Sequence, residues 1–131
     1  MMIYIANCVL SRFHVHLDGL DWVSNYEKTR WFLVLHVGKP EGDHLNRLLG
    51  LTNQTLGLFG QPPLYASGEG GGEDYSDCFH ISIGWCLEEP SAADKERIQQ
   101  STRAFSSLDI YFLEVKAKIG NRVASVPLRA C

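Results

Sequence analysis

The sequence predicts an α+β fold, an antiparallel sheet with helices packed on one side, and three observations indicate it. Apolar and polar residues alternate along residues 13–17, which is the period of a half-buried strand. Leucines recur at helical spacing after Pro40, as expected for a helix that buries one stripe. Near the C-terminus, Gly120 and Asn121 separate two strand-like runs and supply the tight turn of a hairpin.

The first half of the chain is expected to form strands and then a helix. The strand "RFHVHL" ends in a turn at "DGL" (residues 18–20), after which "DWV" continues into a second short strand. The run "RWFLVLHV" (30–37) is apolar on both faces, which is typical of an inner strand. Pro40 then opens a helix, where its missing N–H does no harm. The stripe that this helix buries is predicted to consist of Leu45, Leu48, Leu49, Thr52 and Leu56.

In the second half, "GQPPLYA" is predicted to be a short extended edge segment, because two prolines exclude a central strand. The glycine-rich stretch 67–74 is predicted to be a surface loop, and "FHISIGW" (79–85) a strand. A surface helix is expected over 91–105, with a capping-box-like start at Ser91 and Asp94. Its apolar stripe is thin and consists of Ile98, Thr102 and Phe105. The run 109–128 closes the chain as two strands.

Composition limits the class of protein. The chain has 131 residues, 45% of them hydrophobic, which suits one globular domain. No apolar run approaches the roughly 20 residues of a membrane span. The four cysteines are scattered, so neither a zinc site nor a disulfide framework is expected. With a net charge of −3, the chain as a whole has no broad basic surface for duplex nucleic acid. Near the C-terminus, a basic stretch without acids would suit either a short phosphate backbone or a solvated strand face; it consists of Lys116, Lys118, Arg122 and Arg129.

His80 and Ser82 are the candidate catalytic pair in the strand 79–85. The pleat is expected to place His80, Ser82 and Gly84 on one face, and Phe79, Ile81, Ile83 and Trp85 on a buried face. An imidazole can exchange a proton at a phosphate ester, and a hydroxyl beside it can donate a hydrogen bond to a phosphoryl oxygen. Taken alone, H-x-S is a short pattern that favours a structural histidine.

Four blocks in order make the pattern more specific: "NYEKTRWFLVLHV" (25–37), "HLNRLLGLTNQTLGLFGQPPLY" (44–65), "FHISIGW" (79–85) and "VKAKIGNRVASVPL" (115–128). In this order they resemble the U6 small nuclear RNA phosphodiesterases of the 2H phosphoesterase superfamily, in a fungal-like form. The resemblance implies a nuclear, metal-independent 3′-to-5′ exoribonuclease that trims the uridine- or adenosine-rich 3′ end of U6 precursor RNA. The expected product carries a 2′,3′-cyclic phosphate or a 3′-phosphate, and neither a cofactor, DNA nor a membrane is involved.

The resemblance also implies residue roles. Such enzymes use two H-x-S/T motifs across a cleft between two lobes, and one histidine of the pair donates a proton to the leaving 5′-oxygen. His80 matches that donor and Ser82 the phosphate-binding serine of the second motif. Tyr65 matches a tyrosine that contacts the terminal nucleotide, and Tyr75, nearer to the motif in sequence, is the alternative.

The first H-x-S motif of such enzymes has no counterpart in this chain. His14 and His16 lie in the strand after the expected position, so they are assigned no catalytic role and are expected to be exposed; His36 and His44 are interpreted as structural or solvated. Residues 13–131 are therefore interpreted as one lobe plus part of the other of a two-lobed 2H phosphoesterase, from a fragment, a truncated gene model or a degenerate copy. Residues 1–12 remain unplaced. Three expectations follow from the missing motif: the chain alone is inactive, or it binds RNA ends without catalysis, or it forms a homodimer that pairs two copies of His80. We also expect an exposed apolar face where the missing lobe would pack.

Overall fold

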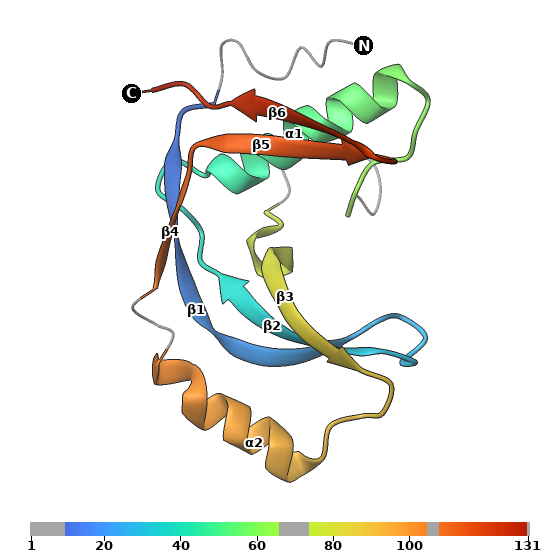
Figure 1. Ribbon diagram of the computed structural model, residues 1–131, viewed down its shortest axis with the longest axis vertical. Coiled ribbons are helices and arrows are strands. Elements are labelled where there is room, and N and C mark those ends of the chain that lie inside the picture. The colour runs from blue at the N-terminus through green and yellow to red at the C-terminus, as the bar shows by residue number, and fades with distance from the viewer. Residues whose placement is uncertain (1–9, 66–73, 105–107, 131) are drawn as a thin grey trace. The chain divides into compact units, whose positions relative to one another are not determined.

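The computed structural model describes residues 10–65, 74–104 and 108–130 (Figure 1). The chain divides into two compact units. The first unit comprises Met1–His14, Pro40–Tyr75 and Ile110–Cys131, and the second unit comprises Val15–Lys39 and Ser76–Asp109. Four parts of the sequence predictions lie outside the described residues: positions 67–73 of the predicted loop 67–74, Phe105, Cys8 and Cys131. The described elements are β1 (Phe13–Ser24), β2 (Trp31–Val37), α1 (His44–Leu58), β3 (His80–Cys86), α2 (Ala92–Ser101), β4 (Asp109–Phe112), β5 (Glu114–Ile119) and β6 (Arg122–Pro127), with short 3₁₀ turns at Ser76–Cys78 and Thr102–Ala104.

The second unit is built on an antiparallel sheet in which β2 lies between β1 and β3. The apolar run predicted as an inner strand is therefore confirmed. Val15 and Val34 are fully buried, and the core around them includes the buried side chains of Leu17, Leu20 and Leu35. β4 continues the same sheet beyond β1, which makes β3 and β4 its edge strands.

β1 runs without interruption through residues 18–20, so the predicted turn and second short strand are wrong. The register of β1 against β2 shifts between Leu17 and Gly19, which indicates a β-bulge at this point. Gly19 is required there, because a Cβ atom would lie 2.7 Å from Cγ2 of Thr102. The Thr102 hydroxyl also accepts a hydrogen bond from the Leu20 N–H at 3.2 Å. The glycine thus lets the strand bend past the end of α2 rather than reverse.

The surface helix α2 begins as predicted. Ser91 is its N-cap, and the serine hydroxyl accepts the Asp94 N–H at 3.1 Å. No residue of α2 is fully buried, and Ile98 and Thr102 are only half-buried, as expected of a thin apolar stripe. The ammonium group of Lys95 lies 5.2 Å from the ring centroid of Trp31, and this contact connects the helix to β2.

In the first unit, α1 begins at His44 and not at Pro40 as predicted. The Pro40 carbonyl accepts the Asp43 N–H at 3.0 Å, so residues 40–43 form a turn that precedes the helix. His44 then packs against Phe13, with ring centroids 4.9 Å apart. Of the predicted stripe only Leu49 is buried, whereas its other members are half-buried. The remaining buried hydrophobic residues of the unit are Leu10, Phe13 and Leu128.

The C-terminal hairpin is confirmed, with Ile119 opposite Arg122 and Gly120 at φ 59°. The run before the Gly120 turn forms two strands, β4 and β5, instead of the predicted one, because the chain changes from one sheet to the other at Leu113. β4 belongs to the sheet of β1, whereas β5 pairs with β6 in a separate two-stranded sheet. The α+β class is confirmed. Neither of the two described helices has the length and hydropathy that a bilayer span requires.

Candidate functional site

His80 is the first residue of β3, and its side chain is exposed. Its Nδ1 lies 2.8 Å from the carbonyl oxygen of Cys78. Because a carbonyl oxygen can only accept, Nδ1 carries the proton and donates this bond. The Nε2 atom is then the one available to exchange a proton with a ligand. This local arrangement gives the ring one orientation and one chemically active nitrogen.

Ser82 is also exposed and lies two residues further along β3. The two side chains point from the same face of the strand, as predicted, and are about 7 Å apart along it. We call the side of the sheet that carries them the His80 face. It comprises His80, Ser82 and Trp85 of β3 and Phe32, His36 and the buried Val34 of β2. An imidazole and a hydroxyl at this spacing can contact one phosphate group from two sides.

A β-bulge changes which residues accompany His80 and Ser82. Ser82 lies opposite Val34, whereas Gly84 lies opposite Leu33, so Ile83 is an additional residue in β3 without a partner in β2. Beyond the bulge the alternation is reversed. The prediction that Gly84 shares the face of His80 is therefore wrong, and Trp85 takes its place, opposite Phe32.

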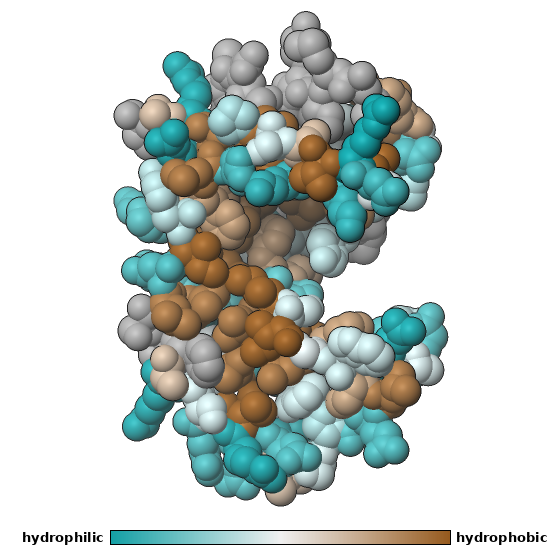
Figure 2. Space-filling view, in the orientation of Figure 1, coloured by the Kyte–Doolittle hydropathy of each residue, from teal (hydrophilic) through white to brown (hydrophobic). Residues whose placement is uncertain are grey.

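The second face of β3 was expected to be buried throughout, and this expectation is also wrong. Phe79 and Ile81 are half-buried, whereas Ile83 is 50% exposed and Trp85 62% exposed. β3 is an edge strand with a neighbour on one side only, and the bulge at Ile83 interrupts the regular alternation on which the prediction rested. Hydrophobic side chains are accordingly visible at the surface of the second unit (Figure 2).

His36 lies directly opposite His80 in the strand register, which places both imidazoles on the His80 face. Its Nε2 is 3.5 Å from a carboxylate oxygen of Asp21, and its side chain is 37% exposed. The sequence predicted only a structural or solvated histidine at this position. The alternation of residues along one strand does not tell which residue of the next strand lies opposite. The neighbouring position of His36 could therefore be found only from the pairing of β2 with β3.

The two candidate tyrosines both belong to the first unit. Tyr65 is 56% exposed and has a positive φ of 57°, which is unusual for a bulky residue. The stretch predicted as an extended edge segment belongs to neither described sheet over residues 61–65. It is held instead by Asn53, whose amide accepts the Leu64 N–H at 2.8 Å and donates to the Leu64 carbonyl at 3.1 Å. Tyr75 is half-buried, and its N–H donates to Asn46 at 2.9 Å.

The other histidines have local partners. His14 and His16 are exposed, as predicted; the ring of His14 stacks on Tyr111 with centroids 4.3 Å apart, and His16 forms an ion pair with Asp109. His44 has a structural role. Its Nδ1 donates to the Glu41 carbonyl at 2.9 Å, and its Nε2 accepts a hydrogen bond from the hydroxyl of Ser11, which precedes β1, at 3.1 Å. In the predicted basic stretch, Lys116 is paired with Glu114 at 3.1 Å.

A pair of residues at the end of the His80 face was not anticipated from the sequence. The guanidinium of Arg30 lies 5.5 Å from the ring centroid of Trp85.

The second unit also carries an ion pair and two cysteines near the ends of β3. Lys95 donates to the Glu89 carboxylate at 2.9 Å and holds the pKa of that carboxyl below its usual value. Cys78 and Cys86 are free thiols. Among residues 10–65, 74–104 and 108–130, no group of three histidine, cysteine or acidic side chains is arranged to hold a metal ion.

Comparison with known proteins gives three findings. The sequence matches the profile of the HVSL family, described as an uncharacterised conserved protein, over residues 3–127. The U6 snRNA phosphodiesterase 1 of Neurospora crassa is 36% identical over 89 residues, which cover 60% of this chain and 23% of that protein. The structure of Kluyveromyces marxianus Usb1 superposes with a TM-score of 0.51 at 18% identity, and its structure with uridine monophosphate with a TM-score of 0.50 at 18% identity.

The superpositions cover 90% of this chain, and 60% and 58% of the two Kluyveromyces chains. The chain therefore spans less than a quarter of the Neurospora protein and about three-fifths of the Kluyveromyces one. At 18% identity these structures show the fold alone. The predicted resemblance to the U6 snRNA phosphodiesterases is confirmed by the sequence similarity, and the α+β class by the fold.

Proposed function

The chain belongs to the HVSL family, and on that premise we propose that it supplies one half of the active site of an RNA phosphodiesterase that trims the uridine-rich 3′ end of U6 snRNA precursor. The observation that carries the proposal is the pair His80 and Ser82, exposed on one sheet face, with Nδ1 of His80 engaged by the Cys78 carbonyl and Nε2 left for the substrate. A U6 substrate implies a nuclear protein. Residues 13–131 are proposed to be the C-terminal part of the phosphodiesterase domain.

In the proposed reaction, the 2′-oxygen of the penultimate nucleotide attacks the adjacent phosphorus. A P–O2′ bond forms and the P–O5′ bond breaks, while Nε2 of a protonated His80 gives its proton to the leaving 5′-oxygen. Ser82 donates a hydrogen bond to a non-bridging phosphoryl oxygen. The RNA then ends in a 2′,3′-cyclic phosphate, formed without addition of water as in a lyase, and hydrolysis of that ester would give a phosphate monoester. DNA lacks the 2′-OH and is excluded as a substrate.

The proposed scheme routes no step through a metal ion, but it needs a second group to accept the proton of the 2′-OH. His80 and Ser82 form the only H-x-S in this chain, so a second motif has to come from another polypeptide segment. Tyr65 is proposed to contact the base of the terminal nucleotide, because an exposed aromatic ring offers a stacking surface. Tyr75 remains the alternative.

The single H-x-S also favours a second candidate function, in which the chain binds RNA ends without cleaving them. A homodimer that brings two copies of His80 together is a variant of the first function. Turnover by this chain alone together with a dimeric mass in solution would favour the homodimer, whereas a monomeric mass would contradict it.

Binding of uridine monophosphate tests the proposed half-site. The chain is expected to bind this nucleotide, and His80→Ala is expected to weaken binding by about tenfold or more, because a charge-assisted hydrogen bond to phosphate is worth roughly 1.5–3 kcal/mol. The measurement is a calorimetric titration. His14→Ala is the matched control, since that histidine is exposed in β1 and has no proposed role. Equal affinity in the His80 and His14 variants would refute the half-site.

A further inference from the structure

Trp85 is a large aromatic side chain that the structure leaves 62% exposed. The bulge at Ile83 brings Trp85 onto the His80 face. Trp85 lies opposite Phe32 and Ser82 lies opposite Val34; because Phe32 and Val34 are two residues apart on β2, all four side chains share one face. Trp85 is thus one ladder repeat beyond Ser82, about 7 Å along the sheet. Without the bulge, regular alternation from Ser82 would point the indole from the opposite face.

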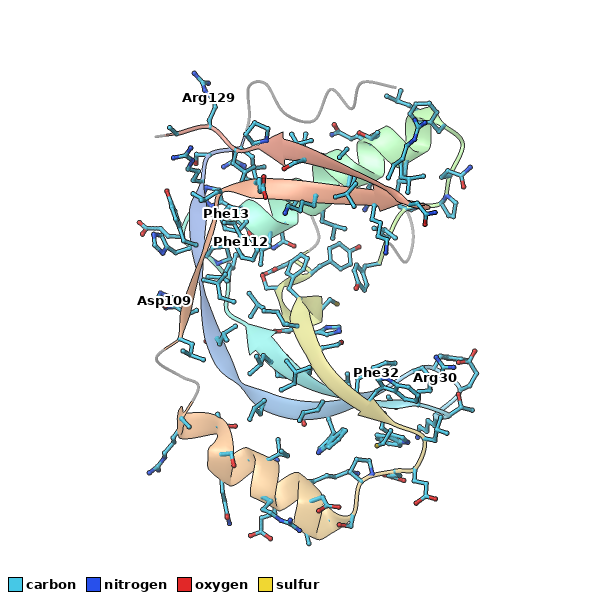
Figure 3. The ribbon with its side chains drawn as sticks, viewed as in Figure 1. Phe13, Arg30, Phe32, Asp109, Phe112 and Arg129 are labelled. Atoms are coloured by element: carbon cyan, nitrogen blue, oxygen red, sulfur yellow. The ribbon has the colours of Figure 1, made fainter. Side chains whose placement is uncertain are left out.

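Arg30 places a cation beside this indole. Its guanidinium lies 5.5 Å from the Trp85 ring centroid. Figure 3 shows Arg30 and Phe32 close together at the N-terminal end of β2. The backbone of Arg30 is fixed by Asn25, which accepts the Arg30 N–H at its side-chain oxygen at 3.0 Å and donates its own N–H to the Arg30 carbonyl at 3.0 Å. The turn 25–30 therefore delivers the guanidinium to a defined place.

The charge of Arg30 is available to a ligand. None of the described acidic side chains forms an ion pair with it. The carboxylate of Glu89, which follows β3, is instead engaged by Lys95. The end of the His80 face thus combines an exposed indole with an uncompensated cation, and the matching ligand has a flat ring and a negative charge.

We propose that Trp85 and Arg30 form a stacking subsite for a nucleotide of single-stranded RNA, next to the nucleotide whose phosphate is held at His80 and Ser82. This inference rests on the proposed function. Proteins bind single strands by stacking bases on aromatic rings and by placing cations along the backbone, and this pair offers both. Because Trp85 lies one repeat beyond Ser82, the subsite serves a neighbouring nucleotide and leaves a mononucleotide at His80 untouched.

Two RNA probes separate the subsite from the phosphate site. The full chain is titrated with uridine monophosphate and with a single-stranded pentauridylate. Trp85→Ala is expected to weaken pentauridylate binding by about tenfold and to leave mononucleotide binding unchanged. Trp85→Phe should retain most of the affinity, because phenylalanine can still stack. Arg30→Met should weaken pentauridylate binding and lower the slope of log affinity against log salt by about 0.7, the value for one lost phosphate contact on a single strand.

Tyr26→Ala is the matched control, because Tyr26 is 98% exposed and belongs to the same turn as Arg30; it should change neither affinity. Mononucleotide binding also verifies that each variant is folded. If Trp85→Ala bound pentauridylate as well as the unchanged chain while mononucleotide binding still required His80, the subsite would be refuted and the proposed function would stand. If neither probe bound, the proposed function and the subsite would fail together. A dimer that Trp85→Ala converts to a monomer would assign the indole to a second copy of the chain and contradict the subsite.

Discussion

Trimming of a uridine-tailed RNA is expected when the chain is combined with an N-terminal lobe that carries an H-x-S motif, and His80→Ala is expected to lower that rate by about 10²- to 10⁴-fold. The chain alone supplies one proton-transfer histidine, so it is expected to trim poorly or not at all. The lobe to supply is the corresponding region of the Neurospora crassa relative, which extends well beyond the segment matched here. The measurement is the length of a 5′-labelled RNA over time, together with the chemistry of the new 3′ end.

Two controls define the outcome. His14→Ala should trim at the unchanged rate, because this exposed histidine has no proposed role. A substrate with 2′-deoxyuridine at the penultimate position should resist cleavage, since no 2′-oxygen is available to attack. Trimming that is indifferent to His80→Ala would exclude His80 as the proton donor. Absence of trimming in every combination, with nucleotide binding retained, would favour the RNA-end-binding function.

Phe13→Ala is expected to lower the free energy of unfolding by about 3–5 kcal/mol, which is a large part of the roughly 5–15 kcal/mol that stabilises a typical domain. Phe13 is only 5% exposed and stacks on His44 and on Phe112, with ring centroids 4.9 and 5.2 Å apart (Figure 3). Removing the ring leaves a cavity between β1, the start of α1 and β4. The measurement is urea denaturation followed by circular dichroism.

Phe59→Ala is the matched control for this variant, because it removes the same ring from a position that is 56% exposed at the end of α1. Its effect should stay within about 0.5 kcal/mol. A loss at Phe13 no larger than the loss at Phe59 would contradict the packing of the first unit.

The sequence predicted those features that depend on one segment alone. The apolar run of β2, the cap at Ser91 and the turn at Gly120 each follow from local residue types, and the structure confirms them. The side-by-side placement of His80 and Ser82 follows from the two-residue period and is also confirmed. The family resemblance could be inferred because four separate blocks occur in one order.

The errors arise where one segment depends on another. Gly19 was interpreted as part of a turn, but it permits close approach to Thr102, a residue more than 80 positions away. The bulge at Ile83 exists only in the pairing of β3 with β2, so alternation alone placed Trp85 on the wrong face. Likewise, nothing local marks Leu113 as the point where the chain leaves one sheet for another.

The most direct test of the half-site at His80 and Ser82 is the NMR spectrum of the histidine side chains with and without uridine monophosphate. Long-range ¹H–¹⁵N correlations should identify neutral His80 as the Nδ1–H tautomer, as its bond to the Cys78 carbonyl requires. Added nucleotide should shift the His80 ring signals and leave those of His14 unchanged, and Ser82→Ala should weaken that response. An Nε2–H tautomer at His80, or signals at His80 that do not respond to the nucleotide, would contradict the account.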